Sequence, residues 1–282
     1  MSVYTKKLIC AAAVCLAVLV GKPLPAYSYV LEGRHILFLM IEEMKLPGNL
    51  AARQQVTQYD LETGEEILTA TETIRFRMPE EFRSEIDAGG LNRTYVASAD
   101  RSITMIDGRV TSETDIWTDY YKNIFWYRSL ERLENFLENY GVDPSVSSLG
   151  RFKGEVAFVI GDVYPSESAA QLWVARETFR PVRWLFRAGD DNSGIEPLEF
   201  RYAEWKQFGR IWFPSRIEFY VNGQMIRLIR VGMLESAPPP REIFDIDHIR
   251  HTFSADDNGA AAVEPESEIR RRLEDFKRIY EQ

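Results

Sequence analysis

Histidines and carboxylates are the residue types in this chain that could carry acid–base or metal chemistry. There are three histidines, His35, His248 and His251. The last two belong to the stretch Asp245-x-Asp247-His248-x-x-His251, whose imidazole and carboxylate groups are ligands that zinc or another divalent cation accepts. The stretch follows the last predicted strand and precedes a linker, where such side chains are commonly just solvated. We therefore predict no metal site and no cofactor.

A hydrolase would need a nucleophile beside a base, and the sequence offers no such pair. It contains no Gly-x-Ser-x-Gly turn and no glycine-rich phosphate loop. Glu199, Glu204 and Glu218 lie on predicted strands and alternate with apolar neighbours, which is typical of a solvated face. A glycosidase needs two carboxyl groups held about 5–10 Å apart, and the sequence nominates no such pair. We predict no catalytic residue and no enzyme, with an enzyme of envelope lipid or glycan as the least favoured hypothesis.

Large apolar side chains are concentrated on the predicted strands, above all in the second half of the chain. The segment 155–163 is apolar on both faces, so both faces must be covered. A sheet of this size achieves that most simply by curving around a core or a cavity. A solid aromatic core remains the alternative. The residues that we predict to line a cavity for lipid are Phe76, Met78, Phe158, Trp184, Phe186, Phe200, Phe213 and Phe219.

The elements that must position these side chains begin with a helix over 30–44, which Pro47-Gly48-Asn49 ends. Period-two alternation then predicts a hairpin of 53–61 with 66–78, followed by strands at 82–87, 93–98, 103–106 and 110–116. A helix over 127–140, with Leu130, Leu133, Phe136 and Leu137 on one face, interrupts the strands.

The second half of the chain is predicted to be almost entirely strands. These are 155–163, 170–176, 182–187, 198–206, 211–221 and 224–231, with a short strand at 243–246. Asn222-Gly223 is the strongest hairpin signal, because both residues tolerate the positive φ of a tight turn. Residues 251–267 read as a linker and 268–282 as an amphipathic helix. The fold class is therefore mainly β with helices, an α+β arrangement around a curved antiparallel sheet.

The first 28 residues have the layout of a cleavable secretory signal peptide. Lys6 and Lys7 precede an uncharged apolar run, and Ala26-Tyr27-Ser28 supplies small residues at the cleavage site. Both cysteines, Cys10 and Cys15, lie in this segment, so the mature chain would have no disulfide. Its removal takes away three lysines and no acidic residue, which changes the net charge from −9 to −12. Such an acidic chain is a poor nucleic-acid binder. We expect a periplasmic protein without a nucleic-acid partner.

Three stretches resemble the periplasmic lipoprotein carriers of the LolA-like family. Arg75 to Ile86, with Pro79, Phe82 and Arg83, resembles the family's strand pair of the form basic-x-Pro-x-x-Phe-Arg. Residues 98–106 resemble its Asp-Gly turn and strand, although Arg101 replaces the glycine, and residues 205–231 resemble a later strand pair. The resemblance spans about 29–247, and residues 254–282 are additional to the family pattern.

The resemblance implies an eleven-stranded unclosed β-barrel, a half-barrel with a helical lid over a hydrophobic cavity. It also implies a carrier that moves lipid, or the acyl chains of lipoproteins, from an inner-membrane donor complex toward an outer-membrane acceptor. In the family an arginine of an early strand controls the lid and cargo release, and Arg75, Arg77 and Arg83 occupy the matching region. The alternative is a non-catalytic envelope sensor or interaction module, with the helix at 268–282 contacting a protein partner.

Overall fold

The computed structural model describes residues 30–99, 101–113, 117–186 and 197–255 of the chain. The predicted signal peptide (1–28) and the predicted helix at 268–282 lie outside these residues, as does most of the predicted linker. All the described helices and strands fall within one compact unit, Leu31–Gln282. Within the described ranges, no helix is both long enough and apolar enough to cross a membrane.

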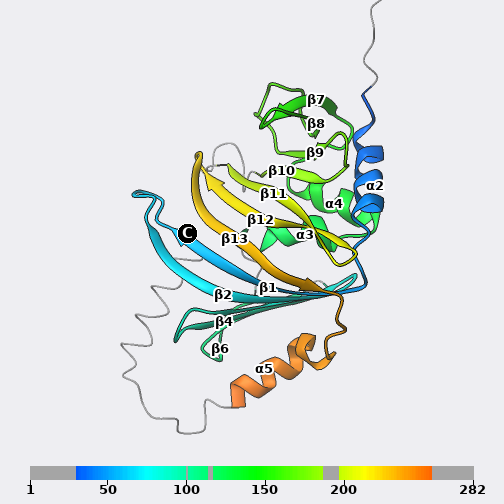
Figure 1. Cartoon of the computed structure of the whole chain (residues 1–282). Coiled ribbons are helices and arrows are strands. Elements are labelled where there is room, and N and C mark those ends of the chain that lie inside the picture. Colours follow the sequence, from blue (N-terminus) through cyan, green and yellow to red (C-terminus); the bar gives the residue numbers. More distant parts are fainter. Residues whose placement is uncertain (1–29, 100, 114–116, 187–196, 256–282) are drawn as a thin grey trace, which may run out of the picture. The chain divides into compact units, whose positions relative to one another are not determined.

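The described strands form one antiparallel sheet of thirteen strands, in the order β6-β5-β4-β3-β2-β1-β13-β12-β11-β10-β9-β8-β7. The pairing of β1 with β13 joins the two halves of the sheet. β6 and β7 are its edges and do not pair with each other in the described part, so the curved sheet in Figure 1 is unclosed. The strands are β1 (Asn49–Tyr59), β2 (Glu66–Arg77), β3 (Glu81–Asp87), β4 (Asn92–Ser98), β5 (Arg101–Ile106), β6 (Arg109–Ser112), β7 (Ser147–Phe152), β8 (Glu155–Ile160), β9 (Gln171–Ala175), β10 (Pro181–Phe186), β11 (Leu198–Phe208), β12 (Ile211–Val221) and β13 (Gln224–Glu235).

Helices lie on both faces of the sheet (Figure 1). We call the inner face the one that carries the 3-10 helix η1 (Trp117–Lys122) and the helices α3 (Asn123–Trp126) and α4 (Leu130–Asn139). The helix α2 (Gly33–Met44) packs against α4. The outer face of β3–β6 carries the 3-10 helix η2 (Glu242–Phe244) and α5 (Ile246–Ala255).

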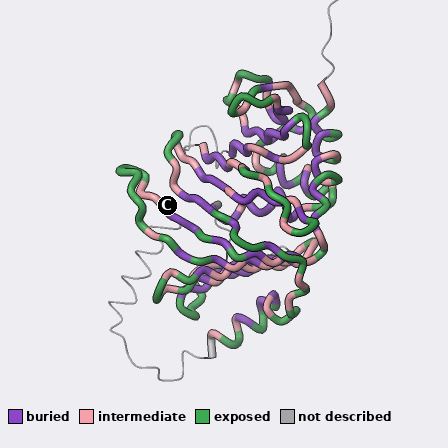
Figure 2. Tube along the Cα trace, viewed as in Figure 1, coloured by how far each residue is buried: buried purple, intermediate pink, exposed green. Residues whose placement is uncertain are grey.

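The alternation of side chains along β4 shows why both faces need a cover. Tyr95 points to the inner face, where its ring contacts Phe82 at 6.0 Å. Its neighbour Val96 points outward and packs in a cluster with Phe244 and Ile249. Both residues have an exposed fraction of 0%, and the buried runs along these strands are visible in Figure 2. The prediction that β8 is apolar on both faces is likewise confirmed, since Ala157 and Val159 join an outer-face cluster and their neighbours are also buried.

The hairpin predictions agree with the structure. The turn Asn222-Gly223 joins β12 and β13, with φ of 51° and 75° at its two residues. β1 and β2 form the predicted long hairpin, and β3 to β6 continue it as predicted.

The helices and the strand count differ from the predictions in four places. The sheet has thirteen strands rather than the eleven that the resemblance implies. The short strand predicted at 243–246 is wrong: these residues form η2 and the start of α5, because Asp245 accepts the N–H of His248 and caps a helix. α5 continues through 251–255, the first residues of the predicted linker. β7, η1 and α3 had not been predicted.

Candidate functional site

One helical segment covers the inner face of the sheet, and we call it the helical cover (residues 117–140, comprising η1, α3 and α4). Its aromatic side chains pack directly on those of the strands. Phe125 lies 4.9 Å from Phe213 and 5.2 Å from Tyr202, measured between ring centroids. The Tyr202 hydroxyl also donates to the Tyr121 carbonyl oxygen at 3.1 Å. Residues 117–126 do not alternate between apolar and polar side chains, so the sequence pattern did not predict this segment. The signal that could have identified it is its high content of aromatic residues, in the sequence Trp-Thr-Asp-Tyr-Tyr-Lys-Asn-Ile-Phe-Trp.

Three of the eight side chains predicted to line a cavity form a continuous row on the inner face. Trp184 stacks on Phe200 at 5.1 Å, and Phe200 meets Phe219 edge-on at 5.0 Å. The helical cover lies on this row, since Phe136 is 5.4 Å from Trp184 and Tyr121 is 5.4 Å from Phe219. In this structure the aromatic row is therefore covered by side chains of the helical cover.

Three more of the predicted cavity residues are also on the inner side. Phe186 lies 5.0 Å from Tyr140 of the helical cover, and Phe213 meets Phe125 as described above. Phe76 pairs with Phe82 at 4.8 Å on the inner face of β2 and β3. The remaining two are Phe158, which stacks on Phe179 at 5.8 Å, and Met78, which is half-buried after the end of β2. Their role in binding lipid stays a prediction.

A buried charged cluster holds η1 against the sheet, and it consists of Glu72, Arg93, Asp119, Lys122 and Arg227. Both Arg93 and Asp119 are 1% exposed, and the guanidinium donates to the two carboxylate oxygens at 2.6 and 3.3 Å. Burial alone would raise the pKa of Asp119, but the neighbouring Arg93 guanidinium lowers it below the ordinary value. Asp119 is therefore a buried anion whose charge depends on its partner.

Lys122 and Arg227 extend this cluster along the inner face. The Lys122 ammonium donates to the backbone oxygen of Asp119 at 3.0 Å, and it lies 4.9 Å from the ring centroid of Tyr95. Arg227 of β13 donates to the backbone oxygen of Thr118 at 3.2 Å and approaches Glu72 at 3.5 Å. The charged cluster therefore ties η1 to strands of both halves of the sheet. Sequence reasoning missed these residues, because the direct neighbours of each in the sequence are uncharged.

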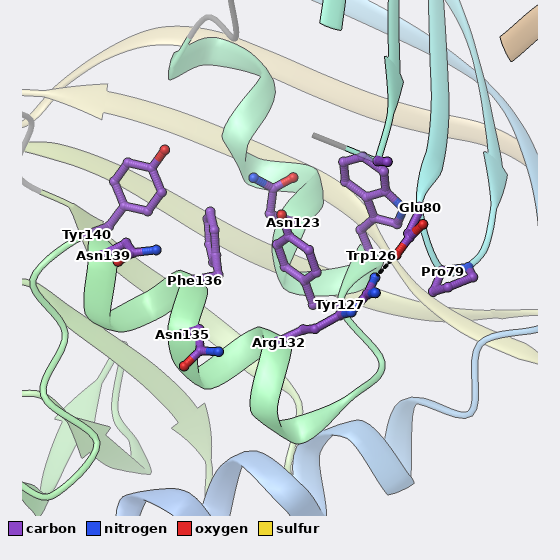
Figure 3. Close-up of a pocket in the computed structure, with 11 residues that line it drawn as sticks. Pro79, Glu80, Asn123, Trp126, Tyr127, Arg132, Asn135, Phe136, Asn139 and Tyr140 are labelled. Atoms are coloured by element: carbon purple, nitrogen blue, oxygen red, sulfur yellow. Dashed lines mark ion pairs between the residues drawn. The ribbon is translucent and has the colours of Figure 1, made fainter. Parts of the chain in front are cut away.

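A cavity of about 510 Å³ lies between the helical cover and the turns that follow β2 and β4. Its walls combine aromatic rings, amides and one ion pair, between Arg132 and Glu80 (Figure 3). None of the eight predicted residues lines it. Its lining consists of Pro79, Glu80, Ala99, Asn123, Trp126, Tyr127, Arg132, Asn135, Phe136, Asn139 and Tyr140.

Two polar atoms in the cavity wall are buried and have no hydrogen-bond partner in the protein. They are the side-chain oxygen Oδ1 of Asn123, an acceptor, and the indole Nε1–H of Trp126, a donor. These residues are 3% and 4% exposed. A buried polar group without a partner costs about 1–3 kcal/mol.

The three arginines matched by resemblance to the family's lid arginine lie on the outer face. Arg75 and Arg83 both pair with Glu85, and Arg83 also donates to the backbone oxygen of Ile243 at 3.0 Å. Arg77 pairs with Glu81 at 2.9 Å. The alternation along β2 and β3 places them opposite Phe76 and Phe82, so these arginines face η2 and not the helical cover. Their control of a lid stays a prediction, whereas the strand arginines Arg93 and Arg227 do contact the cover.

The histidines, and the carboxylates of the stretch 245–251, are exposed. Asp247 pairs with Arg101 at 2.9 Å, while His248 and His251 are exposed on α5. Among the described residues, no three histidine, cysteine or acidic side chains are grouped as metal ligands would be. His35 is exposed on α2 and stacks on Phe38 at 6.2 Å.

The glutamates of the outer face are ion-paired rather than simply solvated. Glu199 accepts from Arg183 and from Arg201, each at 2.6 Å, and Glu218 accepts from Arg216 at 2.5 Å. Glu199 and Glu218 are 7% and 3% exposed. Burial opposes ionisation, yet the hydrogen bonds from Arg201 and Arg183 lower the pKa of Glu199. Glu204 is exposed, 3.8 Å from Arg216. These carboxylates form ion pairs with arginines of the same or a neighbouring strand and do not line the cavity.

Solved structures share this arrangement of sheet and helices. A LolA superfamily protein from Nitrosomonas europaea aligns with a TM-score of 0.55 and 14% identity, over 78% of this chain and 100% of that one. The fold is LolA-like. A domain assigned to the outer membrane lipoprotein-sorting proteins, from Vibrio parahaemolyticus, aligns with a TM-score of 0.52 and 11% identity, over 77% and 98% of the two chains. A DUF1329 family protein from Desulfovibrio piger aligns with a TM-score of 0.52 and 10% identity, over 77% of this chain and 97% of that one.

These likenesses confirm at the level of the fold the LolA-like resemblance found in the sequence. The unclosed sheet with its helical cover is the shared architecture. No protein-family model matches the chain, and no curated protein does.

Proposed function

We propose that this chain is a non-catalytic carrier of the periplasm that binds lipid, or the acyl chains of lipoproteins, between the helical cover and the inner face of the sheet. The observation that carries the proposal is the aromatic inner face, against which the helical cover and α2 pack and which, among the described residues, no second sheet closes. The LolA-like fold, shared with a lipoprotein-sorting domain, supports the same class of function. The signal-peptide layout of residues 1–28 supports export to the periplasm.

An acyl chain suits this face because both are apolar. Each CH₂ group that leaves water contributes about 0.8 kcal/mol. In the described state the aromatic row is occupied by the side chains of the helical cover, so a bound chain has to take their place. The structure then corresponds to the closed state of a carrier, with the 510 Å³ cavity at the border of the cover as the place where a ligand first enters.

The proposal is tested with residues 29–282 and dansyl-labelled undecanoic acid, whose fluorescence rises in an apolar site. We expect saturable binding, and acyl lipid retained by the purified protein in native mass spectrometry. Asn139→Trp puts a large ring into the cavity from an exposed position of α4, and we expect it to weaken binding about tenfold or more.

Glu138→Trp is the matched control, because Glu138 is exposed on the same helix and does not line the cavity. It should leave the affinity unchanged. A protein that binds neither the probe nor co-purifying lipid would refute the carrier function. Equal affinities for the two tryptophan variants would show that the ligand does not enter by this cavity.

A further inference from the structure

The two unpartnered polar atoms in the cavity wall indicate what kind of linkage the ligand carries. Asn123 Oδ1 can only accept a hydrogen bond, and Trp126 Nε1–H can only donate one. Asn123 opens α3 and Trp126 closes it, and both residues line the cavity, while the two atoms themselves are covered by protein in this state. Figure 3 shows the Asn123 amide and the Trp126 indole among the other lining side chains.

A ligand group that satisfies both atoms must supply a donor and an acceptor on separate atoms. A secondary amide does so, with its N–H for Asn123 and its carbonyl oxygen for Trp126. An ester offers two acceptors and no donor, and would leave Asn123 Oδ1 buried without a partner. The surrounding rings of Tyr127, Phe136 and Tyr140 suit hydrocarbon next to such a linkage.

We propose that this cavity selects amphiphiles whose acyl chain is attached through an amide, in preference to those attached through an ester. The inference rests on the proposed carrier function and specifies its ligand. The cost of one buried unsatisfied atom, about 1–3 kcal/mol, corresponds to a preference of roughly five- to 150-fold. The mixed lining of amides and the Arg132–Glu80 ion pair places the polar linkage at this cavity and the chain toward the aromatic inner face.

The decisive experiment compares two ligands that differ by one atom group. They are N-dodecanoylglycine methyl ester and the dodecanoyl ester of methyl glycolate, in which an oxygen replaces the N–H. Each displaces dansyl-labelled undecanoic acid from residues 29–282. We expect the amide to bind about tenfold more tightly. This comparison needs no variant.

Three variants then assign the preference to its atoms. Asn123→Leu should weaken the amide ligand alone and so remove the preference. Trp126→Phe, which keeps a ring and removes the donor, should weaken both ligands. Trp205→Phe is the matched control, because the Trp205 Nε1–H is also buried without a partner but Trp205 does not line the cavity. It should leave the ratio of the two affinities unchanged.

Equal binding of the two ligands to the unmodified protein would overturn the amide preference and leave the carrier function standing. A preference that persists in Asn123→Leu would also overturn the assignment. If neither ligand displaces the probe, because the probe itself does not bind, the carrier function and the preference fail together.

Discussion

Removing one member of the Arg93–Asp119 pair should destabilise the protein far more than removing both. Arg93→Met leaves the Asp119 carboxylate buried without its main partner, and Asp119→Leu leaves the guanidinium in the same position. Both side chains are 1% exposed and share hydrogen bonds of 2.6 and 3.3 Å. Breaking such a pair by removing one partner costs about 3–5 kcal/mol, while replacing both with apolar residues costs much less.

The coupling energy follows from a double-mutant cycle. We expect each single variant to lose about 3–5 kcal/mol and the double variant to lose less than either, so the coupling energy should be larger than the loss in one single variant. The Lys122 hydrogen bond survives in all three, because it goes to the backbone oxygen of residue 119. Urea unfolding followed by tryptophan fluorescence measures these free energies, and an unchanged m-value shows that the unfolded state is comparable.

The exposed pair Arg101–Asp247 provides the matched control, with the same residue types and side chains 52% and 67% exposed. The corresponding cycle at that pair should show no measurable coupling. If the losses at Arg93 and Asp119 simply add, the pair does not hold η1 to the sheet, and the interpretation of the buried charged cluster is wrong. Under the proposed function, in which binding requires the cover to move, the double variant should also bind dansyl-labelled undecanoic acid more tightly than the unmodified protein.

Three further predictions concern other parts of the chain. The pKa of Asp119 in the folded protein lies below its usual value of 3.8, so the ionised carboxylate contributes fully to stability above pH 3.8. That contribution is lost as the pH falls from 3.8 through the lowered pKa. In acid titrations over this pH range, Asp119→Asn should therefore lose less stability than the unmodified protein. Gly150→Ala would place a Cβ 2.7 Å from Trp173 and 2.9 Å from Tyr164 and should cost about 1–3 kcal/mol in urea unfolding, whereas Gly48→Ala, with open space around it, should not. Truncation after Ala255 should preserve probe binding, and its loss would instead favour a role of residues 256–282 in the site.

The sheet could be predicted because its strands satisfy local rules. The alternation along residues 66–78, and the Asn222-Gly223 turn with its positive φ, each fix a strand or a connection from a few neighbouring residues. β8, apolar on both faces, indicated correctly that the sheet must be covered twice.

The site was harder to predict because its determinants are far apart in the sequence. Arg93 and Asp119 are separated by 26 positions, and Arg227 and Thr118 by 109. The alternation places Arg93 on the face of Tyr95 and Arg83 on the face of Glu81 and Glu85, but it does not reveal the distant Asp119 with which buried Arg93 pairs. Asn123 and Trp126 gave no signal either, because a missing hydrogen-bond partner is a property of the folded surroundings.

The position of the helical cover in the chain limits how it can move. It connects β6 with β7, which are the two edges of the unclosed sheet. A segment tethered to both rims behaves as a bridge across the opening and not as a flap with a loose end. Lifting the cover would therefore also act on the two edge strands, so under the proposed function ligand entry and the width of the sheet's opening are linked.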